Sequence, residues 1–494
     1  MPCTTILVGK GASYDGSTMI ARNDDSPSGV YTAKKVQVTM PAQQPRTYQS
    51  AISHVTIELP DNPMRYTCVP DAVRTQGIWA ACGVNDAEVG MTATETVTSN
   101  PRVLGADPLV CLQPAKGEQP EIPGGIGEED IVAIVLPYIH SAREGVLRLG
   151  GLLEEYGTYE MNGIAFSDAD EIWWLETIGG HHWIAARVPD DEVVVMPNQF
   201  GLDHFDFDDA FGERKSFMCS ADLRTFIEEN HLDLTLDGEF NPREAFGSHD
   251  DSDHVYNTPR AWYAWRYFLP TSCVWDGPYA DFRPDSDNIP WSAVPERKIT
   301  VEDVKYILSA HFQGTPYDPY RTCGDTSMSG AYRSIGVNRT DHMGLIQIRP
   351  YAPAGCRALE WISFGSNMFN APALLYANTD EIPAYLGSTA GKVSTDTYYW
   401  SSRLIGAMAD ASFKKCQIHI ERYQQIVMSK NHRFIKEYDK LLTEETDSEK
   451  KRIICRKANK EMAEMLQEET DKLLDHVLYE RSNQMKNSYA RSDA

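Results

Sequence analysis

The third residue of the chain is a cysteine, and this position gives it a chemical option that an internal cysteine lacks. If Met1 and Pro2 were removed, Cys3 would carry a free α-amino group. Such an amine has an ordinary pKa of about 7.7–8.0 and could take the thiol proton while the sulfur attacks a carbonyl carbon. One residue would then supply both the nucleophile and the general base. A buried cysteine in a strand is the commoner situation, so position alone does not decide the question.

Two charged residues are expected to lie beside Cys3. Ile6–Val8 and Thr18–Ala21 are short apolar runs separated by a glycine-containing turn, and together they predict a hairpin. The second strand leads into Arg22-Asn23-Asp24-Asp25, which the hairpin returns to the level of Cys3. We expect the Arg22 guanidinium to lower the pKa of the thiol and the Asp25 carboxylate to hold the protonated amine.

With these residues the sequence resembles the N-terminal-nucleophile cysteine hydrolases, in particular the dipeptidase A and secernin family, which is related to bile-salt hydrolases and penicillin V acylases. Arg22 and Asp25 match an arginine and an aspartate that stand three residues apart in that superfamily. Two further matches lie in Val194-Val195-Met196-Pro197-Asn198-Gln199 and in Asn257-Thr258-Pro259-Arg260-Ala261-Trp262. The dipeptidase branch is suggested by Met91-Thr92-Ala93-Thr94-Glu95-Thr96, by Gly127-Glu128-Glu129-Asp130 and by the segment Glu171–Thr177. The resemblance extends over at least residues 3–390.

The resemblance implies a dipeptidase that uses neither a metal nor another cofactor. Cys3 would attack the peptide carbonyl and form a thioester acyl-enzyme, which water then hydrolyses. Asn198 would donate a hydrogen bond to the developing oxyanion, where loss of one donor can cost about 10²–10³ in rate. Arg22, Asp25 and Arg260 complete the catalytic set that the resemblance implies.

The sequence departs from the superfamily pattern at two places. Bile-salt hydrolases carry an asparagine where this chain has Glu95, so we expect Glu95, with Thr94, to bind the substrate, the carboxylate receiving the free ammonium group of a short peptide. A solvated glutamate at a strand end is the alternative reading. The second departure is Pro2, which must leave after Met1, either by self-cleavage or through another aminopeptidase.

The composition excludes several classes of function. The 494 residues carry a formal net charge of −25 with a pI near 4.9, which disfavours binding to nucleic acid. The sequence contains no run of eighteen or more apolar residues, so it predicts no membrane helix. The ten cysteines contain no CxxC pair and the first residues lack the features of a secretory signal, so we expect reduced thiols and a cytoplasmic location.

Strands punctuated by turns fill most of the first 400 residues, interrupted by a predicted helix over Glu128–Tyr156. Gly163–Ser167, Glu171–Thr177 and Trp183–Val188 then predict an antiparallel meander, with Glu192–Met196 after it. This order indicates an α+β protein, and the resemblance implies an αββα sandwich of two antiparallel sheets between helical layers. We expect a catalytic domain over residues 1–400 and a helical segment over 401–494.

The C-terminal segment has a nearly balanced charge, and its patterning predicts long helices over Arg422–Leu442 and Glu449–Leu478. These helices could cover the sheet or build a subunit interface, and a homo-oligomer is one option. Three alternative functions stay open: a related amidase acting on a non-peptide amide, a secernin-like protein that serves a partner without catalysis, and a metal-dependent dipeptidase.

Overall fold

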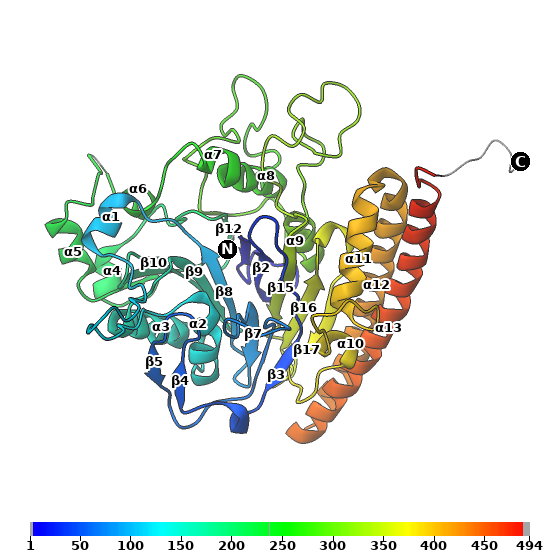
Figure 1. Ribbon diagram of the computed structural model, residues 1–494, viewed down its shortest axis with the longest axis horizontal. Helices are drawn as coiled ribbons and strands as arrows, with labels where there is room; N and C mark the ends of the chain where they lie inside the picture. The colour runs from blue at the N-terminus through cyan, green and yellow to red at the C-terminus, as the bar shows by residue number, and fades with distance from the viewer. Residues whose placement is uncertain (1–2, 237, 488–494) are drawn as a thin grey trace, which may run out of the picture.

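Two large antiparallel sheets form the centre of the computed structural model, which describes residues 3–236 and 238–487 (Figure 1). The first sheet has the strand order β14-β12-β1-β2-β15-β16-β17. Its strands are β1 (Cys3–Val8), β2 (Thr18–Asp25), β12 (Val193–Met196), β14 (Ser292–Ala293), β15 (Thr340–Ile348), β16 (Ala358–Phe364) and β17 (Ala373–Tyr376).

The second sheet has the order β13-β11-β10-β9-β8-β7-β6-β3. Its strands are β3 (Gln37–Thr39), β6 (Tyr66–Cys68), β7 (Cys82–Asn85), β8 (Gly90–Thr96), β9 (Asn162–Ser167), β10 (Ile172–Ile178), β11 (His182–Arg187) and β13 (Phe217–Cys219). A separate pair is formed by β4 (Thr47–Gln49) and β5 (Thr56–Glu58).

The two sheets pack face to face, with β1 and β2 of the first against β8 and β9 of the second. Both β1 and β2 are buried along their whole length. Residues on one face of these strands therefore meet the second sheet, and residues on the other face meet the helices outside. This arrangement places Cys3, the first residue of β1, inside the molecule.

Helices lie on the outer faces of both sheets. The second sheet is covered by α2 (Glu128–Val135) and α3 (Ala142–Tyr156), and the first by α8 (Thr258–Phe268), α9 (Val301–Leu308), α11 (Tyr398–Asp410) and α13 (Ser448–Ser482). The other helices are α1 (Pro101–Ala106), α4 (Phe207–Phe211), α5 (Leu223–Glu229), α6 (Pro242–Phe246), α7 (Asp253–Tyr256), α10 (Ala384–Gly387) and α12 (Phe413–Glu444), with 3₁₀ turns at Pro41–Gln43, Leu136–Tyr138 and Asn367–Phe369. The mixed architecture of two antiparallel sheets and helices is that of a sandwich.

The single helix predicted over Glu128–Tyr156 is wrong, because the structure contains two helices there. Helix α2 ends at Val135, and a 3₁₀ turn that contains Pro137 follows it. Proline lacks the amide hydrogen that a continuing helix needs. Helix α3 then begins afresh after Ser141, whose hydroxyl accepts a hydrogen bond from the Glu144 amide.

The predicted meander is confirmed for β9, β10 and β11, which pair consecutively. The fourth predicted segment, β12, does not continue that sheet. It crosses to the first sheet and pairs with β1, in a register that places Met196 opposite Thr5.

The long C-terminal helices are confirmed, and α12 and α13 lie side by side along one flank of the molecule (Figure 1). Helix α13 covers the edge strand β17. There Asn459 accepts a hydrogen bond from the Tyr376 amide at 2.8 Å and donates one to the Tyr376 carbonyl at 3.0 Å. These bonds satisfy backbone groups that an edge strand would otherwise leave open. No helix among the described residues has both the length and the apolar content needed to cross a membrane.

Candidate functional site

The hairpin of β1 and β2 brings Arg22 to Cys3, as predicted. In its register Cys3 lies opposite Asp24 and Thr5 lies opposite Arg22. Directly paired residues project on the same face of a sheet, so all four side chains point to the same side. Arg22 Nη1 donates a hydrogen bond to Cys3 Sγ at 3.2 Å.

The Arg22 guanidinium is held by acceptors from several elements. Its Nη1 donates to the carbonyl oxygen of Thr94 on β8 and lies 3.6 Å from Glu128 Oε1 at the start of α2. Its Nη2 lies 3.6 Å from Asp24 Oδ1. Although burial acts in the opposite direction, Cys3 and these acidic neighbours raise the pKa of Arg22. The guanidinium is therefore a permanent positive charge beside the sulfur.

The pKa of the Cys3 thiol departs from the prediction. Burial raises this pKa far above its ordinary value, and the opposing effect of Arg22 is smaller. Cys3 is 0% exposed, so the cost of placing a thiolate away from water exceeds the attraction of one guanidinium. The direction expected for Arg22 is correct, but the thiol of the chain that still carries residues 1 and 2 is protonated at neutral pH.

Asn198 lies next to Cys3 because β12 is the neighbour of β1. Met196 is level with Thr5 in the antiparallel register, so the chain beyond β12 reaches the level of Cys3. Asn198 Oδ1 accepts hydrogen bonds from the Cys3 nitrogen at 3.1 Å and from Arg260 Nη2 at 2.8 Å. Asn198 Nδ2 donates to the Thr96 carbonyl oxygen at 2.9 Å. The orientation of the amide is fixed because two donors bind Oδ1 and Nδ2 donates to a carbonyl oxygen.

Arg260, in the first turn of α8, holds the start of β1 in place. Its Nη1 donates to the carbonyl oxygen of Cys3 and, at 2.7 Å, to Thr4 Oγ1. Its Nη2 also donates to Asn257 Oδ1 at 2.6 Å. Arg260 is fully buried, and both burial and the charge of Arg333 lower its pKa. Its contacts are those of a positioning residue for Cys3 and Asn198.

Glu95 reaches the same region from β8. Its Oε2 accepts a hydrogen bond from Thr5 Oγ1 at 2.8 Å, and the residue is 0% exposed. Burial raises the pKa of Glu95 well above its ordinary value, although Arg260 and Arg22 act in the opposite direction. The reading of Glu95 as a solvated strand-end residue is therefore wrong. Thr94 contributes its carbonyl oxygen to Arg22, and its own hydroxyl is buried.

Asp25 lies on the other face of β2. It follows Asp24, the cross-strand partner of Cys3, so its side chain projects on the face of the strand opposite to that of Asp24. There it forms an ion pair with Arg333, and its Oδ1 accepts a hydrogen bond from Thr340 Oγ1 at 2.5 Å. The structure thus brings together Cys3, Arg22, Asn198 and Arg260 directly, whereas the role of Asp25 toward the amine stays a prediction.

Two charged residues of the region were not singled out in the sequence. Arg333 binds Asp25 and lies in a long loop before β15, where no local pattern marks it. Glu128 belongs to a segment that carried the family resemblance, but its approach to Arg22 depends on the packing of α2 against β8. Within the described part of the chain, no group of three or more His, Cys, Asp or Glu residues is placed to hold a metal ion.

The sequence is similar to those of known proteins over most or all of its length. Residues 2–426 match the model of a family described as Peptidase family C69. A protein named "Dipeptidase" from Bifidobacterium longum is 52% identical, with the full length of both chains covered. A "Probable dipeptidase A" from Streptococcus pyogenes is 49% identical over the full length of both chains. "Dipeptidase A" from Lactobacillus helveticus is 40% identical over 97% of this chain and 96% of its own.

These matches confirm the resemblance to the dipeptidase A and secernin family that the residues around Cys3, Arg22, Asn198 and Arg260 indicated. They span the sheets, the site and, in the relatives named, the C-terminal helices as well. The chain belongs to peptidase family C69.

Proposed function

We propose that this protein is a dipeptidase whose nucleophile is the Cys3 thiolate, formed after Met1 and Pro2 are removed. The observation that carries the proposal is the double contact of Cys3. Its sulfur accepts a hydrogen bond from Arg22 at 3.2 Å, while its nitrogen donates to Asn198 at 3.1 Å. The candidate nucleophile, Cys3, thus lies within hydrogen-bond distance of both a cation, Arg22, and a candidate oxyanion residue, Asn198.

Removal of residues 1 and 2 supplies the missing base. In the full chain the Cys3 nitrogen is an amide and cannot accept a proton. After processing it is an amine with an ordinary pKa of about 7.7–8.0, and it belongs to the same residue as the thiol. The amine takes the thiol proton, and the Arg22 guanidinium stabilises the resulting thiolate.

The reaction then follows from these atoms. The thiolate sulfur attacks the carbonyl carbon of the dipeptide, and the Asn198 amide stabilises the negative charge that develops on the carbonyl oxygen. The ammonium of Cys3 returns its proton to the leaving nitrogen, which departs as a free amino acid and leaves a thioester. Water, deprotonated by the same amine, hydrolyses the thioester and releases the second amino acid. Asp25 would hold the ammonium form of the amine during these steps.

Recognition of a dipeptide is assigned to Glu95 and Thr94. A buried carboxylate close to the nucleophile would attract the free ammonium group of a dipeptide, and one hydroxyl or carbonyl beside it could orient that group. Amides without an α-amino group lack an ammonium group at this distance from the scissile bond, whereas a longer peptide carries one beside its first peptide bond. This argument favours the dipeptidase over the amidase alternative.

The proposal also includes the fold family, the domain boundaries, the substrate class and the cellular location. The sandwich would be the αββα fold of N-terminal-nucleophile hydrolases, with a catalytic domain over residues 1–400 and a helical segment over 401–494. A small peptide is the expected substrate and the cytoplasm the expected location. A homo-oligomer built through the C-terminal helices stays one option.

The deciding experiment combines the intact mass of the purified protein with dipeptidase assays. A chain that begins at Cys3 and hydrolyses dipeptides, together with Cys3→Ala protein that folds and is inactive, would support the proposal. Cys3→Ser is the matched variant, because it keeps a nucleophile of nearly the same size but lower acidity. Active protein that retains Pro2 would overturn the N-terminal mechanism. Processed protein that neither hydrolyses dipeptides nor reacts with iodoacetamide would favour the secernin-like alternative.

A further inference from the structure

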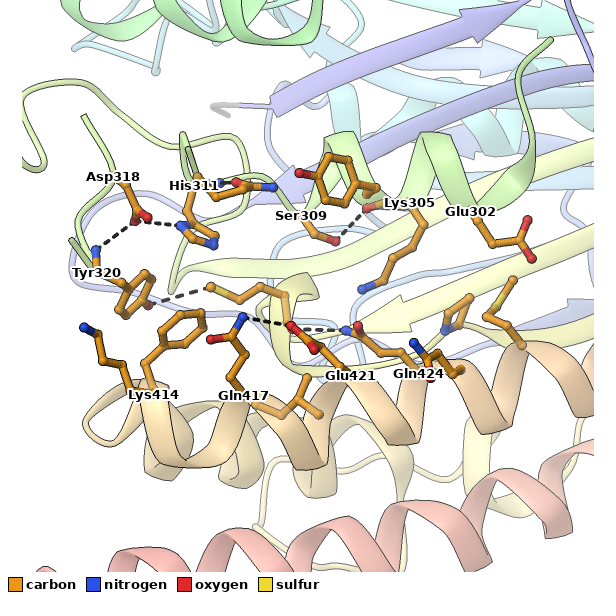
Figure 2. Close-up of a pocket in the computed structure, with 18 of the residues that line it drawn as sticks. Glu302, Lys305, Ser309, His311, Asp318, Tyr320, Lys414, Gln417, Glu421 and Gln424 are labelled. Atoms are coloured by element: carbon orange, nitrogen blue, oxygen red, sulfur yellow. Dashed lines mark hydrogen bonds and ion pairs between the residues drawn. The ribbon is translucent and has the colours of Figure 1, made fainter. Parts of the chain in front are cut away.

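A cavity lined by charged and apolar side chains lies on the outer side of the first sheet, on the face opposite to the Cys3 sulfur. It has a volume of 860 Å³ and lies between α9 and the first half of α12 (Figure 2). Helix α9 packs on the outer face of β1 and β2, whereas Cys3 and Arg22 point to the inner face. None of the residues described around Cys3 lines this cavity. Its volume is typical of a pocket for a small organic ligand.

Lys305 supplies a buried positive charge to this cavity. Its side chain extends from α9 toward α12, as Figure 2 shows, and the residue is 9% exposed. Its Nζ donates to the carbonyl oxygen of Asn367 at 2.7 Å. That carbonyl is held in place because Asn367 Nδ2 donates to Asn23 Oδ1 on β2 at 2.6 Å.

An ammonium group has three hydrogens to donate, and a neutral carbonyl does not balance its charge. Within residues 3–236 and 238–487, no carboxylate lies at ion-pair distance from Lys305 Nζ. Burial alone lowers the pKa of Lys305, to about 7, with no acidic neighbour to oppose the effect. A buried charge without a counter-charge is costly, and an anionic ligand would remove that cost.

The acidic residues around the cavity already have partners of their own. The pairs are Glu302 with His432 at 2.5 Å, Asp318 with His311 at 2.8 Å, and Glu421 with Gln417 at 2.8 Å. Lys414, at the other end of the cavity, donates to Thr322 Oγ1. Lys414 and Glu421, whose partners are neutral, are exposed. Among the described residues of this lining, Lys305 is therefore the buried charged group without a counter-charge.

Part of the lining is suited to an apolar body. Phe413, Ile420 and Met428 of α12 face the cavity, together with Met368. An aromatic or branched group could pack on these side chains while a charged end reached Lys305.

We propose that this cavity binds a small organic acid, whose carboxylate pairs with Lys305 and whose apolar body packs against α12. The carboxylate would accept the two hydrogens of Nζ that Asn367 does not use. Binding would hold Lys305 in its ammonium form and so take up a proton from solution at pH 8. The other titratable groups that line the cavity are Glu302, Tyr306, His311, Asp318, Tyr320, Lys414, Glu421 and His432.

The test uses the full chain and 4-phenylbutyrate, with titration calorimetry as the measurement. We expect binding that weakens by about tenfold or more in Lys305→Met, since a charge-assisted hydrogen bond is lost. Lys414→Met, in the same lining, is the matched control and should bind within about twofold of the unchanged protein. At pH 8 the heat of binding should vary with the ionisation enthalpy of the buffer in a way that shows proton uptake, and Lys305→Met should abolish this variation.

Two further measurements separate this site from the one at Cys3. Cys3→Ala protein should bind 4-phenylbutyrate as tightly as the unchanged chain. If Lys305→Met fails to fold, Met428→Trp, which fills the cavity from α12, should weaken binding instead. The proposal is overturned if millimolar 4-phenylbutyrate does not bind, if 4-phenylbutylamine binds as well as the acid, or if Lys305→Met leaves the affinity unchanged.

Discussion

Thr5 on β1 donates a hydrogen bond of 2.8 Å to Glu95 on β8, and this bond joins the two sheets at the level of the Cys3 sulfur. Thr5 is the cross-strand partner of Arg22, and the carbonyl of Thr94, next to Glu95, accepts a hydrogen bond from Arg22. A carboxyl group is thus fixed in a buried position where its protonation state affects both stability and substrate binding.

The first prediction concerns the pH dependence of stability in Glu95→Gln. The pKa of Glu95 is raised from 4.5 to about 8 in the folded chain, chiefly by burial. The folded protein therefore binds this proton more tightly than the unfolded chain. The resulting stabilisation is present below about pH 4.5 and is lost as the pH rises toward 8. Glutamine resembles the protonated carboxyl and should avoid that loss.

Thermal unfolding at several pH values measures this effect. Glu95→Gln should raise Tm by about 2 °C or more at pH 8.5, and by less at pH 5.5. Glu302→Gln, on the outer helix α9, provides a control in which the carboxyl is already paired with His432. A difference in Tm between Glu95→Gln and the unchanged protein that is the same at every pH would contradict the prediction.

A second prediction follows for substrate binding by Glu95. The ionised carboxylate is the form that attracts an ammonium group, so KM for a dipeptide should fall as the pH rises toward the pKa of Glu95. In Glu95→Gln this dependence should disappear and KM should be raised about tenfold, with a smaller change in kcat. An unchanged KM for Glu95→Gln would exclude Glu95 as the amine anchor.

The third prediction separates the two ends of the Asn198 amide. Asn198→Asp keeps the oxygen that accepts from the Cys3 nitrogen and from Arg260, but it replaces the donating nitrogen. If Asn198 stabilises the oxyanion, kcat should fall by about 10²–10³, more than the lower Tm expected from the lost hydrogen bond to the Thr96 carbonyl can explain. A fall in Tm that accounts for the lost activity would instead indicate a structural role for Asn198.

Arg22→Lys tests the contact between the guanidinium and the sulfur. Arg22 Nη1 donates hydrogen bonds to both Cys3 Sγ and the Thr94 carbonyl oxygen, and Nη2 forms an ion pair with Asp24. A single ammonium group cannot reproduce this fork, so kcat/KM should fall by about 10²-fold. In the processed enzyme, the pH at which iodoacetamide labelling is half-maximal should rise, because the thiolate loses part of its stabilisation. Labelling with an unshifted pH profile would show that Arg22 does not tune the thiol.

The final prediction concerns Asp25 and Arg333. Both are almost fully buried, and Arg333→Met would leave the Asp25 carboxylate without its cation. We expect a loss of about 3–5 kcal/mol in the free energy of unfolding, much of it recovered in the double variant with Asp25→Asn. Arg357→Met, at a half-exposed pair with Glu88 at 3.9 Å, should cost less than about 1 kcal/mol. Denaturant unfolding measures all three, and a double variant no more stable than Arg333→Met would disprove the coupling.

Local sequence was sufficient for the hairpin, the meander and the long C-terminal helices. Each depends on spacing within one segment: two apolar runs around a glycine-containing turn, alternating strands between Asp-rich breaks, and helical periodicity over α12 and α13. The residues Cys3, Arg22, Asn198 and Arg260 could be grouped because their motifs occur in a recognisable order. Their proximity in the structure agrees with that grouping.

Contacts between distant segments decided the features that local sequence could not predict. The side of β2 on which Asp25 projects depends on a register of one residue, and β12 leaves the meander because its partner is β1. The pKa values of Cys3 and Glu95 depend on how completely two sheets exclude water, which neither residue's neighbours in the chain reveal. The lysine of α9 had no distinguishing pattern in the sequence. Only the packing of α9 beside α12 buries its charge against a cavity.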